Sequence, residues 1–120
     1  MNNEDTNLSF YLRSNAIHIF KDAIRVIGTP EFIRFRVHPD GTSMLMESYD
    51  RITLTSFRVP KNVDTGRSLV VHSKAFCRIM ANRLGWDISE SYRVPGRMIP
   101  SENVVIFDLT KAVPIREYRN

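Results

Sequence analysis

Four basic residues have a spacing that suits contact with the phosphates of a nucleic acid. Lys21 and Arg25 are four residues apart in a segment with helical periodicity, and Lys74 and Arg78 repeat this spacing in a second such segment. Residues four apart share one face of a helix, so each pair predicts a small basic ridge. Mixed charge is also the default on an exposed helix face, and a solvated face is therefore the alternative interpretation.

Arg34 and Arg36 form a second basic pattern, in a segment that alternates with apolar residues. In a strand every second side chain points to the same face, so both arginines would share a face with Phe32 and His38. An aromatic ring among arginines is typical of surfaces that stack the bases of nucleic acids. The alternative interpretation is the outer face of a half-covered sheet.

The sequence contains no arrangement that is typical of catalysis or metal binding. His18, His38 and His72 are not at ligand intervals from one another, from a cysteine or from a pair of carboxylates. Cys77 lies near the apolar side of its predicted helix, which indicates a buried structural thiol. Asp108 has no carboxylate companion for acid–base work, and there is no phosphate-binding glycine loop. We therefore predict a non-enzymatic protein without a metal or another cofactor.

Composition limits the class of protein further. The 120-residue chain has 17 Lys and Arg against 13 Asp and Glu, which gives a net charge of +4 and a pI near 9.6. This modest surplus is compatible with a nucleic-acid partner but does not require one. The longest apolar run, 104–107, is too short to cross a bilayer. A polar, acidic start and a single cysteine argue against a signal peptide and an internal disulfide, so we expect a soluble, cytoplasmic protein.

Two segments carry the start and stop signals of helices. Ser73 is a candidate N-cap and Gly85 a candidate C-cap, with Trp86 folding back as the hydrophobic contact of such a stop. The same signals occur earlier, where Ser14 is the start and Gly28 the stop. The serines are 59 positions apart and the glycines 57, which predicts an internal repeat.

Shorter segments have the alternation or the apolar runs that are expected of strands. They span residues 8–13, 32–38, 43–49, 52–59, 69–71, 92–94, 104–109 and 113–118. Pro39-Asp40-Gly41 is a turn signal between two of them. Pro95-Gly96 interrupts another, which predicts a short or bent strand or a sheet edge. A shift in apolar phase within 52–59 predicts a bulge or an edge. We expect residues 1–6 to be a flexible tail and 60–67 to be a polar connection.

These elements predict an α+β fold in a single domain, residues 1–120. Two β-α-β-β-β-like units, about 7–59 and 67–118, would pack two helices on one face of an antiparallel sheet. The predicted core contains Ile17, Phe20, Ile24, Ile27, Phe35, Val71, Phe76, Ile79 and Phe107.

The order of elements and the segment SLVVHSKAFCRIMANRL resemble one domain of the DNA polymerase sliding clamps. The resemblance implies a clamp-like fold whose helices face DNA, with the basic pairs of the two helices on that surface. The TATA-binding-protein fold, which also packs helices on a curved sheet in tandem halves, is the alternative. A clamp chain carries two or three such domains and this chain carries one, so a ring would need several copies.

From these patterns we expect a small binding module that associates, without sequence preference, with DNA or with a DNA-handling complex. The alternative is a protein-interaction or regulatory protein that binds through an exposed sheet edge, supplied by residues 92–100 or by the C-terminal strand. Open sheet edges also predict self-association into a homo-oligomer. Binding that weakens steeply with salt would distinguish phosphate contacts from strand pairing.

Overall fold

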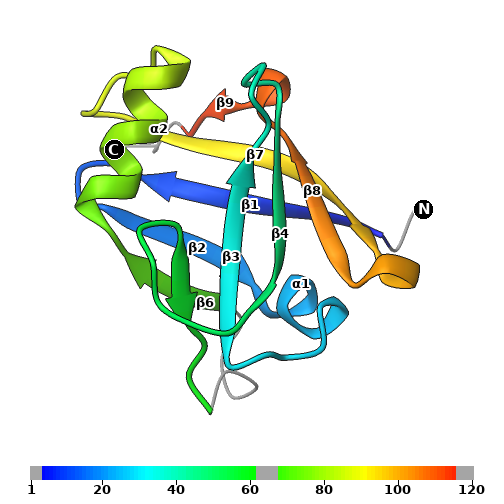
Figure 1. The fold of residues 1–120 in the computed structure, drawn as a ribbon. Helices are drawn as coiled ribbons and strands as arrows, with labels where there is room; N and C mark the ends of the chain where they lie inside the picture. The colour runs from blue at the N-terminus through cyan, green and yellow to red at the C-terminus, as the bar shows by residue number, and fades with distance from the viewer. Residues whose placement is uncertain (1–3, 62–67, 116–120) are drawn as a thin grey trace, which may run out of the picture.

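The computed structural model describes residues 4–61 and 68–115. Its strands form one antiparallel sheet in the order β5-β3-β4-β8-β7-β1-β2-β6, and β9 pairs with β7 (Figure 1). The strand bounds are β1 Asp5–Tyr11, β2 Ala16–Phe20, β3 Phe32–Val37, β4 Ser43–Tyr49, β5 Ser56–Arg58, β6 Ser68–His72, β7 Ser91–Ile99, β8 Val104–Asp108 and β9 Val113–Pro114. The helices are α1, Lys21–Val26, and α2, Lys74–Leu84, with short 3-10 helices at Pro100–Glu102 and Leu109–Lys111.

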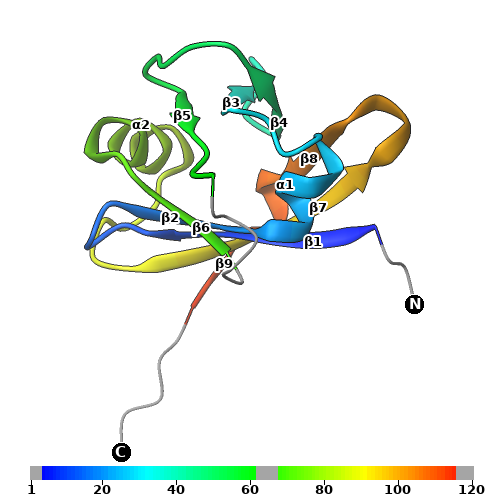
Figure 2. The same ribbon diagram turned by 90° about the horizontal axis from the view of Figure 1, so that it is seen from below.

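The sheet curls until it is nearly a closed barrel. β1, β2, β6 and β7 lie in one layer and β3, β4 and β5 face it, while α2 lies at one end of the molecule and α1 lies apart from it, between the layers (Figure 2). The predicted α+β fold, two repeated units with both helices on one face of a sheet, is therefore wrong. The clamp-like architecture and the TATA-binding-protein-like alternative are wrong with it, because curled strands, not a helical layer, enclose the core.

The segment predicted as the first helix, 14–28, is a strand followed by a short helix. Residues 16–20 form β2, and only Lys21–Val26 is helical. β2 pairs on both sides, with β1 and with β6, and its Ile17 and Ile19 are fully buried. Branching at Cβ favours strands over helices. Two neighbouring strands therefore outweigh the helical periodicity of the same residues, and this segment forms no long helix.

The second predicted helix is confirmed with both of its caps. The Ser73 hydroxyl accepts a hydrogen bond from the backbone N–H of Phe76 at 3.1 Å, as an N-cap does. Gly85 ends α2 with φ 69°, in the left-handed region that glycine enters without strain. The N–H of Trp86 then donates to the carbonyl of Ala81 at 2.9 Å.

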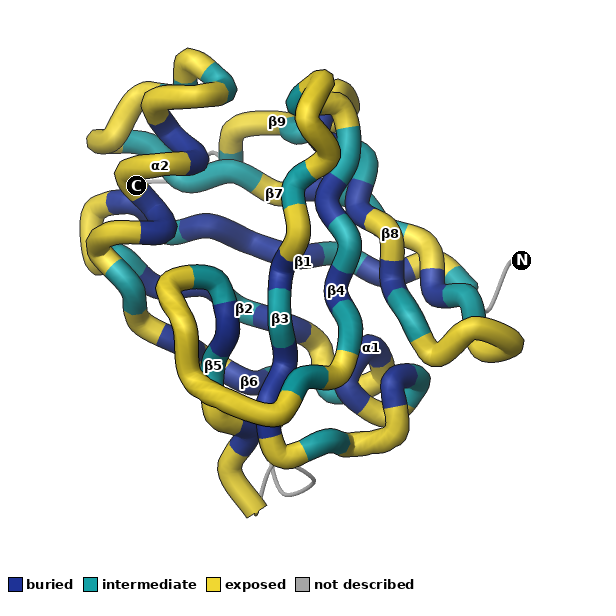
Figure 3. Tube along the Cα trace, viewed as in Figure 1, coloured by how far each residue is buried: buried dark blue, intermediate teal, exposed yellow. Residues whose placement is uncertain are grey.

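Apolar side chains from both layers of the sheet meet in one core. Phe76 of α2 lies at its centre, with ring centroids 5.5 Å from Phe35 of β3, 6.0 Å from Phe57 of β5 and 6.2 Å from Phe10 of β1. Burial alternates along the middle of β3, from Ile33 to Arg36, and along β4 from Ser43 to Glu47 (Figure 3). One side chain of α2 thus connects strands from the two facing layers.

Most of the predicted core residues are buried. The buried ones are Ile17, Ile24, Ile27, Phe35, Val71, Phe76 and Phe107. The predictions for Phe20 and Ile79 are wrong, because 46% and 44% of their surface is exposed. Phe20 is the last residue of β2 and its side chain lies on the outer face, and Ile79 is on the side of α2 that faces away from the core.

The turn at Pro39-Asp40-Gly41 is confirmed, and the interruption at Pro95-Gly96 is wrong. β7 runs unbroken through both residues. On one flank of β7, the ladder with β9 ends at Arg93 and the ladder with β8 starts at Gly96. Pro95 lies between these two ladders, where its missing N–H is tolerated. Glycine is needed at position 96 because a Cβ there would lie 2.5 Å from the ring of Phe107.

The remaining predictions concern the chain ends and connections. β1 begins at Asp5, so the predicted tail 1–6 is too long, and its residues 1–3 lie outside the described residues. Most of the connection 60–67 and the end of the strand 113–118 also lie outside them. The strand predicted at 52–59 is shortened to β5, an edge strand, as its apolar phase indicated. Within residues 4–61 and 68–115, no helix is long and apolar enough to cross a membrane.

Candidate functional site

The two basic pairs on the helices do not form one surface. α1 carries Lys21 and Arg25, α2 carries Lys74 and Arg78, and the two helices lie well apart and not side by side (Figure 2). The guanidinium of Arg25 also lies 3.7 Å from the carboxylate of Asp22, one turn earlier in the chain. A single phosphate backbone could follow one of these pairs but not a joint strip made of both.

The predicted strand arginines share one carboxylate. The register of β3 and β4 places Arg34 opposite Glu47, and Arg36 is two residues further on the same outer face. Glu47 Oε2 accepts from Nε of Arg34 at 2.9 Å and from its Nη2, and it lies 3.0 Å from Nε of Arg36. Glu47 is only 20% exposed, whereas Arg36 remains 59% exposed. Arg36 is therefore the more accessible of the two cations.

Two further arginines extend this surface, which we call the arginine face: Arg34, Arg36, Arg51 and Arg58. The guanidinium of Arg34 lies 4.1 Å from the ring centroid of Tyr49, and that of Arg51 lies 5.4 Å from the same ring. Arg58 similarly lies 4.8 Å from the ring of Phe32, which is buried. The aromatic rings thus support arginines through cation–π contacts, in place of the open stacking surface that the sequence predicted.

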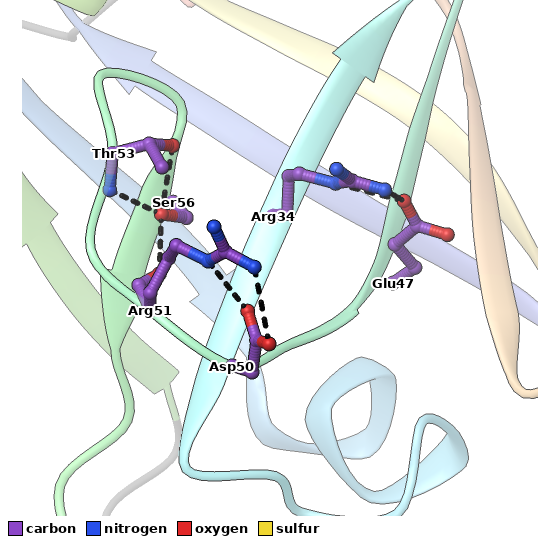
Figure 4. Close-up of polar contacts among 6 residues, drawn as sticks. All are labelled: Arg34, Glu47, Asp50, Arg51, Thr53 and Ser56. Atoms are coloured by element: carbon purple, nitrogen blue, oxygen red, sulfur yellow. Dashed lines mark hydrogen bonds and ion pairs between the residues drawn. The ribbon is translucent and has the colours of Figure 1, made fainter.

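Carboxylates accompany most of the arginine face (Figure 4). Asp50 accepts from Nε of Arg51 at 2.9 Å, and Glu31 accepts from Arg58 at 3.3 Å. Hydrogen bonding to Arg51 lowers the pKa of Asp50, and hydrogen bonding to Glu47 raises the pKa of Arg34. Four guanidinium groups thus face three carboxylates. A polyanion would have to exchange these internal pairs for its own phosphates, which reduces the net gain from each contact.

The loop that carries Arg51 is held by a buried serine. Ser56 is fully buried, accepts from the N–H of Thr53, contacts the Thr53 hydroxyl at 2.9 Å and donates to the carbonyl of Arg51 at 2.7 Å (Figure 4). These bonds use the hydrogen-bonding capacity of the hydroxyl. Ser56 therefore positions the loop and is poorly suited to act as a nucleophile.

A shallow groove crosses the outer face of β7 and β8. It has a volume of about 640 Å³ and adjoins a second groove of about 420 Å³ over β3 and β4, with Ile106 lining both. Its cations are balanced, since Arg97 lies 3.4 Å from Glu4 and Lys111 lies 3.9 Å from Asp108. This balance gives the groove no clear preference for a charged ligand.

The histidines and the cysteine are not gathered into a site. His18 lies beside Tyr11, with ring centroids 4.5 Å apart, and its pKa is lowered by burial and then by the charge of His72. Nδ1 of His38 lies 2.9 Å from the carboxylate of Asp40. Among the described residues, no three His, Cys, Asp or Glu side chains could together hold a metal ion.

Cys77 is buried in α2. Burial raises the pKa of its thiol to about 11, which keeps it protonated and unreactive near neutral pH.

Of the two sheet edges that the sequence predicted, the C-terminal strand is at an edge and residues 92–100 are not. Residues 92–100 belong mostly to β7, which has neighbours on both sides, so this segment is not an edge. In the described part of the chain, β5 pairs only with β3, β6 only with β2, and the C-terminal strand β9 only with β7. The apolar run 69–71 suggests a strand buried on both faces, but its middle residue, Val70, is 41% exposed.

The outer face beside β6 exposes two large apolar side chains among polar ones. Val70 lies there opposite His18 of β2, and Phe20, which is 46% exposed, lies opposite Ser68 at the end of the same ladder. The strand itself, Ser68–His72, contains no Lys, Arg, Asp, Glu or Pro. We call Ser68–His72 the β6 edge. A signal was present in the sequence, since the run SLVV has no charged residue and directly follows the polar connection 60–67.

Comparisons of the chain with protein-family models, with curated proteins and with solved structures found no match.

Proposed function

We propose that this protein is a non-enzymatic protein-binding module that pairs an extended strand of its partner with the β6 edge. The observation that carries the proposal is that, among the described residues, β6 has a paired strand on one side only. Natural sheet edges are commonly guarded by charges, proline, a bulge or a covering element. The β6 edge has neither charge nor proline, and among the described residues it pairs on one side only. Main-chain hydrogen bonds along such an edge are a recurrent mode of peptide recognition.

The side chains beside the β6 edge fit the same proposal. A paired strand would lie next to Val70, with Phe20 one strand further, and both now expose apolar surface to water. Covering that surface contributes about 25 cal/mol per Å². The partner segment should therefore be extended, largely uncharged, and apolar at alternate positions, and its binding should depend little on salt.

Selection from a displayed library of short extended peptides tests this function. Val70→Lys places a charge at the centre of the β6 edge without filling the core. Ile106→Lys is a matched control, because Ile106 is 38% exposed on the outer face of β8, which has neighbours on both sides. We expect selected peptides to bind the wild type and the control but not Val70→Lys. Failure to select any peptide, or equal binding to Val70→Lys, would contradict the proposal.

A second candidate function is sequence-independent nucleic-acid binding by the arginine face. The observation in its favour is the surplus of four guanidinium groups over three carboxylates, with Arg36 well exposed. Contacts of this kind go to phosphates, position the protein, and weaken as salt screens them. The same reasoning covers the helix pairs, each of which offers at most two contacts.

Duplex and single-stranded binding at low and physiological salt tests this second candidate. The double variant Arg36→Gln and Arg58→Gln removes the accessible arginines of β3 and β5, and Lys74→Gln with Arg78→Gln removes the basic pair of α2. We expect the first pair to weaken low-salt binding by roughly tenfold and the second pair to change it less. Absence of salt-sensitive binding by the wild type would leave the four cations of the arginine face and the four of the helix pairs as solvated surface.

A further inference from the structure

We propose that the strand paired with the β6 edge is β6 of a second copy of this chain, so that two molecules share one continuous antiparallel sheet about a two-fold axis. This inference rests on the proposed function, because it requires the β6 edge to be free and able to pair. It adds the identity of the partner. Two-fold dimers are the commonest protein assemblies, and their contacts must be self-complementary.

The residues of β6 are complementary to themselves. Antiparallel pairing centred on Val70 sets Val70 against Val70 of the second copy, on the outer face. Leu69 then lies opposite Val71 of the other copy, and both are buried side chains of the inner face. Ser68 lies opposite His72. Apolar residues thus oppose apolar residues on both faces, and no two acidic or basic side chains meet.

The strands beside β6 extend this symmetry. In the ladder of β2 and β6, His18 lies opposite Val70 and Phe20 opposite Ser68. Across the two copies, one row of outer-face side chains would therefore be His18, Val70, Val70 of the second copy and its His18. Each of the two neighbouring rows would contain one Phe20 ring. The exposed apolar surface of Val70 and Phe20 is then concentrated around the axis, where pairing can remove it from water.

The other edges of the described sheet are less suited to self-pairing. β5 has three residues, and the loop before it folds back in a bridge from Thr53 to Ser56. Its outer face carries Arg58, which pairs with Glu31. β9 has two residues. β6, with five uncharged residues, offers the longest ladder, although five residues bury less than the roughly 1,200 Å² of a stable interface. We therefore expect a dimer of micromolar or weaker affinity.

Sedimentation velocity over a series of protein concentrations tests the dimer directly. We expect the wild type and Ile106→Lys to shift from monomer to dimer as concentration rises. Val70→Lys, which sets two lysines against each other at the axis, should remain monomeric while circular dichroism shows an unchanged fold. A wild type that stays monomeric at every concentration, or a Val70→Lys protein that dimerises equally well, overturns the proposal.

Cysteine cross-linking tests the register in the same protein. In a Cys77→Ala background, Val70→Cys places two thiols opposite each other across the axis and should form an intermolecular disulfide under mild oxidation. Ser68→Cys alone should not, because its partner is His72, whereas a mixture of Ser68→Cys and His72→Cys should cross-link. Efficient cross-linking of Ser68→Cys with itself overturns this register.

The peptide selection separates this inference from the proposed function. If the wild type stays monomeric while selected peptides still need an intact β6 edge, self-pairing is wrong and the proposed function stands. If neither peptides nor self-association depends on β6, both are wrong.

Discussion

Residues 14–28 and 73–85 have the same boundary signals and fold differently. Each begins with a serine and ends with a glycine at positive φ, 90° at Gly28 and 69° at Gly85. The second segment is an eleven-residue helix, whereas the first is a strand followed by a six-residue helix. The serines also act differently. The Ser73 hydroxyl accepts from an N–H ahead of it, and the Ser14 hydroxyl donates to the carbonyl of Tyr11 behind it.

The difference shows that a capping residue matters only where the next turn can be helical. Asn15 stands at φ 56° and closes a tight turn between β1 and β2, so the chain reverses directly after Ser14. The residues that follow, AIHIF, include two isoleucines and have a neighbouring strand on each side. In α2 the residues after Ser73 are mainly good helix formers, with one β-branched residue, Ile79.

Replacing one phenylalanine in each segment should give the largest difference in stability between the two segments. Phe76 is 1% exposed and contacts three aromatic rings, so Phe76→Ala should lower the free energy of unfolding by about 3–5 kcal/mol. Phe20, taken by its periodicity for a core residue, is 46% exposed, and Phe20→Ala should cost about 1 kcal/mol or less. Urea unfolding at low protein concentration, where self-association is negligible, measures both. Equal losses would contradict the different placement of these rings.

High pH should weaken the second segment in particular. Burial raises the pKa of the Cys77 thiol to about 11 in the folded protein, above its value in the unfolded chain. The folded state therefore keeps its proton longer, and stability that is complete below about pH 8.5 is lost as the pH rises toward 11, by at most about 1.4 kcal/mol per pH unit. Cys77→Ala should remove this part of the pH dependence. Identical alkaline profiles for the wild type and the variant would show that the thiol is not responsible.

Removing each serine hydroxyl tests the caps themselves. Ser73→Ala leaves the N–H of Phe76 without its acceptor and should lower the free energy of unfolding by about 1 kcal/mol. Ser14→Ala removes an exposed hydrogen bond of 3.3 Å in a turn and should change it by about 0.5 kcal/mol at most. Thermal unfolding of the two variants gives the comparison. A larger loss for Ser14→Ala would mean that this serine stabilises the turn more than its contacts suggest.

The same two segments explain how far the sequence predicted the fold. α2 was predictable because its cap, its apolar face and its glycine stop are all local signals, and they agree. β2 was not, because its residues suit a helix by periodicity and a strand by branching, and the neighbours that decide are distant in the chain: β6 lies about 50 residues away. Once β2 was taken for a helix, two repeated units followed, and with them the wrong architecture.

The sequence predicts which face of a strand the basic residues occupy, but it does not predict the contacts that they make. Arg34 and Arg36 do share an outer face, as the alternation indicated. Their ion pairs with Glu47 depend on the register of β3 and β4, which a single sequence does not reveal. The β6 edge was unpredictable for a similar reason. Whether a strand is central or at an edge depends on the order of all strands in the sheet, which a single sequence does not reveal.

Low pH should weaken the first segment, in a smaller effect that complements that of Cys77. The pKa of His18 in β2 is lowered from its usual 6.5, mainly by burial and then by His72. The unfolded chain therefore binds a proton more readily, and stability that is complete above about pH 6.5 is lost as the pH falls below it. Unfolding free energies between pH 8 and pH 5 should decline for the wild type and less for His18→Gln. His38→Gln is the matched control, because His38 is exposed in a turn beside Asp40. If His38→Gln reduced the pH dependence of the unfolding free energy as much as His18→Gln does, the effect could not be assigned to His18.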